Sequence, residues 1–309
     1  MSAAFPPALV PGQPLRSLLP ESTWVRLAES LLERHGLPSA DVAMFSTGSD
    51  VVLGSRAHVV KVSNPNWRAQ MVSEREWNQH LRGRLPLRIA EPLAWGEIDQ
   101  WPYLITERIE GPSLAEVWPT LDRSTRLRLA ADLGTMMAQL HAVEPPDGHA
   151  ARWPAFVAKR HALMDERLAA QGADERWRSE IQQFVQRTAR PERPLVCLHT
   201  ELLGHHVLLE SRDRLRPTAL IDLADAEVGH PDYDVAALVE FVFMGEAGCL
   251  DACLGAYGWS EAERGAAGSQ RLAAWALLHR FSNLPRMLEA VGSPAPTNLD
   301  ALVERLFRW

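Results

Sequence analysis

The sequence contains few cysteines, and they form no pattern that builds a metal centre or a disulfide framework. Three cysteines, Cys197, Cys249 and Cys253, occur among 309 residues, and none of them belongs to a Cys-x-x-Cys pair. No apolar run reaches 18 residues, so no membrane span is expected. The proline-rich first 20 residues also lack the charged and apolar regions of a secretory signal. These absences predict a cytoplasmic protein with no membrane partner.

Basic residues are outnumbered by acidic ones, 32 to 39, and very few of them are lysines. The formal net charge is -7 at pH 7, a sign that disfavours a protein that follows nucleic-acid phosphates. Of the 32 basic residues only Lys61 and Lys159 are lysines. Because lysine and arginine differ in geometry and in hydration, each lysine in such a chain is a candidate functional residue.

The remaining composition is that of an ordinary globular protein, with 46% hydrophobic and 23% charged residues. Short β-rich runs dominate up to residue 109 and helical periodicity dominates afterwards. The sequence therefore predicts an α+β protein with a small N-lobe over residues 1–109 and a larger, mainly helical C-lobe over 110–309. Strands are expected at 42–46, 51–54, 58–62, 93–96, 103–109, 195–198 and 218–221. Helices are expected at 23–35, 73–81, 126–143, 153–170, 174–188, 235–244, 250–257, 270–291 and 299–307.

A loop of small residues between the first and second β-rich runs is the first candidate site. Ser46, Thr47, Gly48 and Ser49 offer backbone N–H groups and hydroxyls, which suit phosphate oxygens. Lys61 follows between flanking valines and could reach the same phosphates. The alternatives are an ordinary hairpin turn and a lysine that faces solvent.

A strongly acidic stretch is the second candidate. Residues 221–263 contain ten acidic side chains and neither lysine nor arginine. Such a stretch suits metal ions or a cationic small molecule. The alternative is a solvated acidic face.

The most specific pattern lies between residues 195 and 236. An apolar run leads into the polar loop 199–206, and a second apolar run ends at Ile221-Asp222. The chain resembles the aminoglycoside phosphotransferase and choline kinase superfamily here, and its hygromycin B phosphotransferase-type members most. The resemblance extends from about residue 23 to about residue 289. In the part of the superfamily pattern that follows the second apolar run, the matching residues are Ile221, Asp222, Ala226, Gly229, Pro231, Tyr233, Asp234 and Ala236.

The resemblance implies a bilobal protein-kinase-like fold with a five-stranded antiparallel sheet in the N-lobe. It implies that Lys61 contacts nucleotide phosphates and is oriented by a helical glutamate, for which Glu74 is preferred to Glu76. At the hinge, Thr106 would line the adenine pocket, and the backbone of Glu107 and Ile109 would pair with adenine. The implied nucleotide-binding residues are Ser46, Thr47, Ser49, Lys61, Glu74, Thr106, Glu107 and Ile109.

The catalytic loop departs from the superfamily pattern at two positions. Glu201 occupies the place of the catalytic aspartate, and His206 that of the metal-binding asparagine, whereas Asp222 is retained. Glu201 is thus the expected catalytic residue, and Asp222 and His206 are the expected metal ligands. The adjacent histidines His205 and His206 could suggest a zinc site instead, but zinc is disfavoured because no third ligand occurs at a matching spacing. His199 is expected to pack inside the loop and Asp234 to hold it in place.

The implied function is an ATP- and Mg²⁺-dependent phosphotransferase, with GTP as a possible donor. The acceptor is expected to be a cationic small molecule, first an aminoglycoside such as hygromycin B, second a macrolide and third a metabolite. Asp225, Glu227 and Asp232 are candidates for pairing with its ammonium groups. The protein is expected to be a monomer. The alternatives are a kinase-fold protein that binds a nucleotide or small molecule without turnover, and a structural scaffold.

Overall fold

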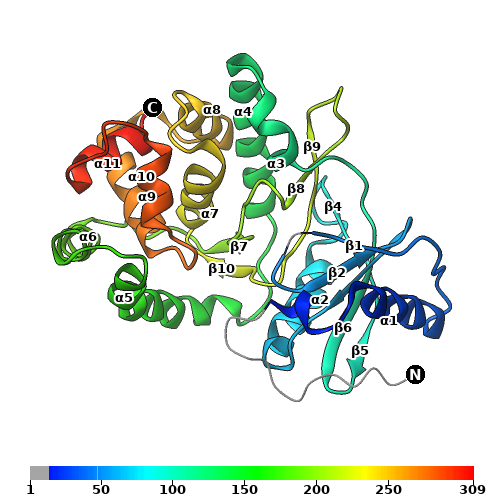
Figure 1. Ribbon diagram of the computed structural model, residues 1–309. Coiled ribbons are helices and arrows are strands. Elements are labelled where there is room, and N and C mark those ends of the chain that lie inside the picture. Colours follow the sequence, from blue (N-terminus) through cyan, green and yellow to red (C-terminus); the bar gives the residue numbers. More distant parts are fainter. Residues whose placement is uncertain (1–13, 47) are drawn as a thin grey trace. The chain divides into compact units, whose positions relative to one another are not determined.

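The computed structural model describes residues 14–46 and 48–309, which form an α+β protein (Figure 1). The chain divides into two compact units. Unit 1 comprises the residues up to Arg84 together with Arg88–Glu110 and Ala219–Asp225. Unit 2 comprises Leu85–Leu87, Gly111–Thr218 and Ala226–Trp309. The sequence predicts one boundary between residues 109 and 110, and the observed grouping differs from it at residue 110 and in the segments 85–87 and 219–225.

Unit 1 is built on a five-stranded antiparallel sheet with the order β1-β2-β3-β6-β5. The short strand β4 pairs in parallel with β9, with Arg88 opposite Ala219 and Ile89 opposite Leu220. The strands are β1 (Ala43–Met44), β2 (Val51–Gly54), β3 (His58–Val62), β4 (Arg88–Ile89), β5 (Pro92–Ile98), β6 (Trp101–Glu107) and β9 (Pro217–Leu220). The predicted bounds of β2 and β3 are confirmed, and β4 was not predicted.

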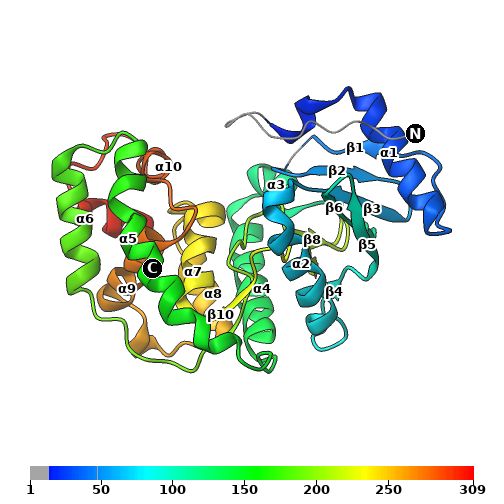
Figure 2. The same ribbon diagram turned by 90° about the horizontal axis from the view of Figure 1, so that it is seen from below.

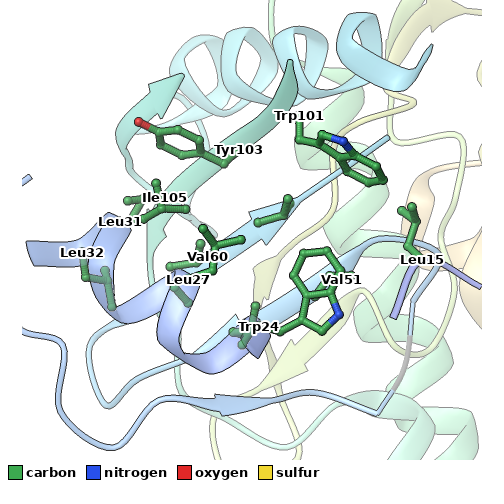
Figure 3. Packing of buried hydrophobic residues seen from close by; sticks show 13 residues of the cluster. Leu15, Trp24, Leu27, Leu31, Leu32, Val51, Val60, Trp101, Tyr103 and Ile105 are labelled. Atoms are coloured by element: carbon green, nitrogen blue, oxygen red, sulfur yellow. The ribbon is translucent and has the colours of Figure 1, made fainter. Parts of the chain in front are cut away.

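Alternation along the strands separates two faces of this sheet. On one face, Val60 of β3 and Ile105 of β6 pack against Trp24 and Leu31 of helix α1 (Glu21–Arg34) (Figure 3). Val62 belongs to the same apolar cluster as Val60. Lys61 lies between these two valines in sequence, so its side chain points to the opposite face.

Helix α2 (Arg68–Leu81) lies on the Lys61 side of the sheet and begins five residues before the predicted start. The reason is local. The Asn64 side chain accepts a hydrogen bond from the Asn66 amide, and Pro65 opens a 3₁₀ turn, η2 (Pro65–Trp67), that runs directly into α2. Helix α2 therefore begins upstream of Ser73, Glu74 and Glu76, whose residue types are common in the first turn of a helix and favour a start at residue 73.

Unit 2 is mainly helical (Figure 2). Its helices are α3 (Leu114–Val117), α4 (Arg123–His141), α5 (Trp153–Ala170), α6 (Glu175–Arg187), α7 (Asp232–Leu238), α8 (Cys249–Tyr257), α9 (Ala266–Leu278), α10 (Leu284–Ala290) and α11 (Leu299–Leu306). Strand β7 (Val196–Leu198) pairs antiparallel with β10 (Glu227–Gly229), and β8 (Val207–Leu209) follows the catalytic loop. Among the described residues, no helix combines the length and apolarity needed to cross a membrane.

Two predicted helices of unit 2 are interrupted. The segment 235–244 changes from α7 to a π-helix, η5 (Val239–Phe243). The expected helix 270–291 is split into α9 and α10, because Asn283 caps α10 and Pro285 occupies its first turn. The break leaves His279 beyond the end of α9, where its side chain has a role in the catalytic loop.

Candidate active site

Lys61 lies in a buried ion-pair cluster of unit 1. Its Nζ atom is 2.7 Å from Oε2 of Glu74 in α2 and 2.9 Å from Oδ1 of Asp222, which follows β9. Lys61 is only 8% exposed, and Glu74 only 6%. The predicted choice of Glu74 is confirmed as a pairing, whereas the roles of both residues toward a nucleotide stay predictions.

Negative charge exceeds positive charge around this lysine. Burial lowers the pKa of Lys61, but the carboxylates of Asp222, Glu74 and Asp50 outweigh burial and hold that pKa well above its usual value. Burial raises the pKa of Glu74 and that of Asp50 against the pull of the same ammonium group. Three carboxyl groups therefore share one cation, an arrangement that favours the arrival of further positive charge.

Asp50 was missed as a site residue by the sequence analysis. The Ser63 hydroxyl donates a hydrogen bond to its Oδ1 atom at 2.5 Å, which fixes the carboxyl beside the Lys61 cluster. The available signal was the position of Asp50, which closes the small-residue loop just before β2. The negative charge of an acid at this place repels a phosphate group. This repulsion is weaker when a divalent cation is bound to the phosphate.

The small-residue loop is held from outside by Arg16. Its guanidinium donates hydrogen bonds to the backbone carbonyls of Ser46 and of Gly48, the latter at 2.7 Å. Ser46 and Ser49 are exposed, as phosphate-contacting hydroxyls must be. The third predicted residue of the loop, Thr47, lies outside the described residues.

The predicted hinge residues follow the central strand β6. Thr106 is buried at 8% exposure, and the Glu107 amide donates to the Glu91 carbonyl at 2.9 Å. Within residues 14–46 and 48–309, the Ile109 amide has no hydrogen-bond acceptor. An amide of this kind at a strand end can pair with a ligand, so the adenine-binding role remains a proposal that the backbone permits.

In unit 2, Asp234 holds the backbone of the catalytic loop, as the sequence predicts. Its two carboxylate oxygens accept the amide hydrogens of His199 at 2.9 Å and Thr200 at 2.7 Å. Asp234 also faces Nε2 of His141 at 3.2 Å and is fully buried. A buried carboxylate that accepts several hydrogen bonds is well satisfied, which makes it a structural rather than a reacting group.

The loop backbone is strained at its centre. Thr200 has φ 65°, a left-handed conformation that non-glycine residues seldom adopt. His279 stabilises it by donating from Nε2 to the Thr200 carbonyl at 2.7 Å. Burial lowers the pKa of His279 to about 4, so its ring is neutral at pH 7. The break between α9 and α10 thus places a neutral donor under the catalytic loop.

Glu201 and His206 lie on this loop and are connected through the backbone. The Nδ1 atom of His206 is 2.9 Å from the carbonyl oxygen of Glu201. A carbonyl only accepts, so Nδ1 carries a proton, and in the neutral form of this ring Nε2 is the acceptor nitrogen. The His206 ring also stacks on fully buried His199, at 5.6 Å between centroids. His206 is therefore held in the tautomer that can ligate a metal.

The acidic residues proposed to bind a cationic substrate occupy unequal positions. Asp232 is fully buried, and its Oδ2 atom accepts from Nε of Arg271 at 2.6 Å, so the structure places it in the interior and corrects its predicted substrate role. Glu227 accepts from the Val228 amide at 3.0 Å. Asp225 belongs to unit 1, where its charge helps to raise the pKa of Asp50.

Comparison with known families decides the affiliation of the chain. A model of the phosphotransferase enzyme family (APH) matches residues 47–275. The chain belongs to this family. It is therefore a small-molecule phosphotransferase, and the predicted superfamily and the predicted enzyme class are confirmed.

Solved structures of such phosphotransferases share the kinase-like fold. An aminoglycoside-3'-phosphotransferase of type VIII is 22% identical with a TM-score of 0.60, covering 82% of this chain and 97% of that one. An aminoglycoside 2''-phosphotransferase with bound GDP and kanamycin is 18% identical (TM-score 0.61; 77% and 82% covered). A thermostable mutant of the aminoglycoside phosphotransferase APH(4)-Ia in complex with ADP and hygromycin B is 20% identical (TM-score 0.55; 82% and 88% covered).

A curated relative shows that the same sequence pattern occurs within a longer protein. The lysine-specific demethylase JMJ21 of Arabidopsis thaliana is 22% identical over 231 residues, which is 59% of this chain. The match spans about a quarter of that relative's length, 24%. The likeness therefore carries no statement about demethylation here.

Proposed function

We propose that this phosphotransferase transfers the γ-phosphoryl group of ATP, with Mg²⁺, to a hydroxyl of a small molecule. The observation that carries this proposal is the Lys61–Glu74–Asp222 cluster, in which a buried lysine is held between a buried helical glutamate and a second, partly exposed acid. Phosphoryl transfer needs such fixed charge, because it depends on positioning and on electrostatic stabilisation.

In this proposal unit 1 binds the nucleotide. Lys61 contacts the α- and β-phosphates, and Glu74 keeps its side chain in that orientation. Ser46, Thr47 and Ser49 contribute hydroxyls and amides to the phosphates. Thr106 and the backbone of Glu107 and Ile109 bind adenine, and GTP would be accepted where those backbone groups pair with guanine.

The donor types present fit a divalent cation. Asp222 offers a carboxylate oxygen, the ligand class that Mg²⁺ prefers, and the acid excess around Lys61 favours added positive charge. His206 offers Nε2, because its other ring nitrogen faces the Glu201 carbonyl. Asp222 and His206 would hold the ion, and a bound Mg²⁺ neutralises charge on the transferred phosphoryl group.

Glu201 is proposed to accept the proton of the acceptor hydroxyl. It occupies the loop position where the superfamily carries aspartate, and its carboxylate lies one methylene further from the backbone. A displacement of about 1 Å can cost on the order of 100-fold in rate. Glu201→Asp is therefore the informative variant at this position.

The test of the nucleotide role compares the only two lysines of the chain. MgATP should raise the melting temperature of the natural protein, and Lys61→Met should abolish this rise and lower ADP release at least about 100-fold. Lys159→Met, at an exposed position of α5, is the matched control and should change neither. An undiminished MgATP effect in Lys61→Met would contradict the proposal.

A second candidate is nucleotide binding without turnover. It is favoured by the two departures in the catalytic loop, Glu201 and His206. It predicts that MgATP stabilises the protein but that no acceptor accelerates ADP release. Phosphorylation of one hydroxyl compound, measured by mass spectrometry, would eliminate it.

A further inference from the structure

A cavity of about 240 Å³ lies in unit 2 directly beside the catalytic loop. One part of its wall is formed by loop residues 203–205, which follow Glu201. The opposite parts come from α3 with the turn after it, from η5 and from α10. The residues that matter for its chemistry are Trp118, Gly204, His205, Phe241, Met244 and Arg286.

The wall is apolar and carries a single permanent charge, which is positive. Among the described residues, no aspartate or glutamate lines the cavity, and Arg286 is its only arginine or lysine. The acids next to lining residues have partners of their own. Glu116 pairs with Arg212 at 3.2 Å, Glu246 pairs with Arg126 at 3.0 Å, and Glu240, whose carboxyl also lies within the electrostatic reach of Arg286, accepts the Asn283 amide at 2.7 Å.

Arg286 retains most of its capacity to bind an anion. It is exposed, and its guanidinium lies over the Phe241 ring at 5.4 Å. Its hydrogen bonds are long, at 3.4 Å to the Phe241 carbonyl and 3.9 Å to Sδ of Met244. An arginine stacked on an aromatic ring and holding only weak acceptors is preorganised for a carboxylate.

The size of the cavity sets a limit on the ligand. A dry cavity of about 150 Å³ holds benzene, and drug-sized ligands need roughly 300 Å³ or more. A volume of about 240 Å³ therefore suits one ring or a chain of about eight carbons. A multi-ring polyamine would exceed this volume and would place ammonium groups against Arg286.

We propose that this cavity is the acceptor site and that the acceptor is a small apolar hydroxy acid rather than a polycationic antibiotic. Arg286 binds its carboxylate, Trp118 and Phe241 contact its apolar body, and its hydroxyl is presented to the catalytic loop. The γ-phosphorus forms a bond to the hydroxyl oxygen and breaks its bond to ADP, and Glu201 takes the hydroxyl proton. This assignment rests on the proposed function and replaces the predicted cationic acceptor.

The experiment uses three probes that differ only in charge: 8-hydroxyoctanoate, 1,8-octanediol and 8-amino-1-octanol. Binding is measured by titration calorimetry and transfer by ADP release with MgATP. The carboxylate should bind at least about tenfold more tightly than the amine, because a charge-assisted hydrogen bond is worth that much. Arg286→Gln should remove this preference and Arg286→Glu should reverse it. Arg128→Gln, an exposed arginine of α4 that does not line the cavity, should preserve it.

The outcomes separate the acceptor assignment from the proposed function. Phosphorylation of hygromycin B or kanamycin in preference to 8-hydroxyoctanoate overturns the assignment and leaves the phosphotransferase function intact. Failure of all three probes to bind, or a charge preference unchanged in Arg286→Gln, also overturns the assignment. Arg286-dependent binding of 8-hydroxyoctanoate without any effect of MgATP supports the cavity and overturns the proposed function instead.

Discussion

Glu240 shows how one buried acid couples stability to pH. Its Oε1 atom accepts the Asn283 amide, and the residue is only 1% exposed. Burial raises the pKa of Glu240 from an ordinary 4.5 to about 8, in spite of that hydrogen bond and the nearby Arg167. Between these two values the folded protein binds more protons than the unfolded chain, so stability falls as pH rises.

Glu240→Gln should therefore abolish a pH-dependent loss of stability. The loss should be on the order of 5 kcal/mol between pH 4.5 and 8, at 1.36 kcal/mol per pH unit. Urea unfolding at pH 5 and pH 8.5 measures it. The natural protein should be less stable at the higher pH, and the variant should lose less. Glu210→Gln, on the surface beside Arg214, is the control and should leave the slope unchanged. An identical slope in Glu240→Gln would show that the carboxyl is already ionised.

At single residues, the sequence predicted what chain order and chemical rarity can reveal. Lys61 stood out because the chain has two lysines, and Glu74 because a helix was expected after that strand. Asp50 and Arg286 were missed for a physical reason. The charge around each of them is set by segments that are far apart in the chain. Asp50 and residue 222 both lie near Lys61, and Arg286 of α10 lines a cavity together with residues 114–119 and 203–205. Burial and pairing, which excluded Asp232 from a substrate role, likewise appear only in three dimensions.

Helices α4 and α8 show how a close approach constrains a residue. A Cβ atom built at Gly134 of α4 would lie 1.9 Å from the carbonyl oxygen of Cys253 in α8. Backbone atoms cannot rotate away as a flexible side chain can. The two helices therefore require glycine at this position.

Gly134→Ala should lower the free energy of unfolding by about 3 kcal/mol or more, since overpacking a rigid contact costs at least about 1–3 kcal/mol. Gly255→Ala in α8 is the matched control, because its Cβ would meet only the end of the Arg264 side chain at 3.3 Å. That variant should gain up to about 1 kcal/mol of helix propensity. Equal unfolding midpoints in guanidinium for both variants would refute the close-approach argument.

Among the elements, type was easier to predict than extent. The bounds of β2, β3 and α5 agree with the sequence prediction because each lies between clear breaks. The 3₁₀ turn before α2 and the division of 270–291 were missed. Asn-Pro at residues 64–65 starts the first, and Asn-x-Pro at residues 283–285 causes the second, but each short signal competes with a longer helical pattern. Strand β4 escaped because it is two residues long and pairs with a strand about 130 positions away in sequence.

At the scale of the molecule, we expect each unit to bind one of the two substrates. The proposed nucleotide-binding residues belong to unit 1, and the cavity proposed as the acceptor site belongs to unit 2. Hydrogen exchange with MgATP alone should slow the amides of β3 and of the loop before β2. Exchange with 8-hydroxyoctanoate alone should slow those of α3 and η5. Protection confined to unit 2 with MgATP would contradict this division.

The burial of one lysine and the exposure of the other have a practical consequence. Lys61 is enclosed by carboxylates, whereas Lys159 lies on the surface of α5. Amine-directed coupling to a sensor chip or a dye therefore has a single accessible lysine side chain in this sequence. Molecules attached through Lys159 would share one orientation and keep Lys61 chemically intact.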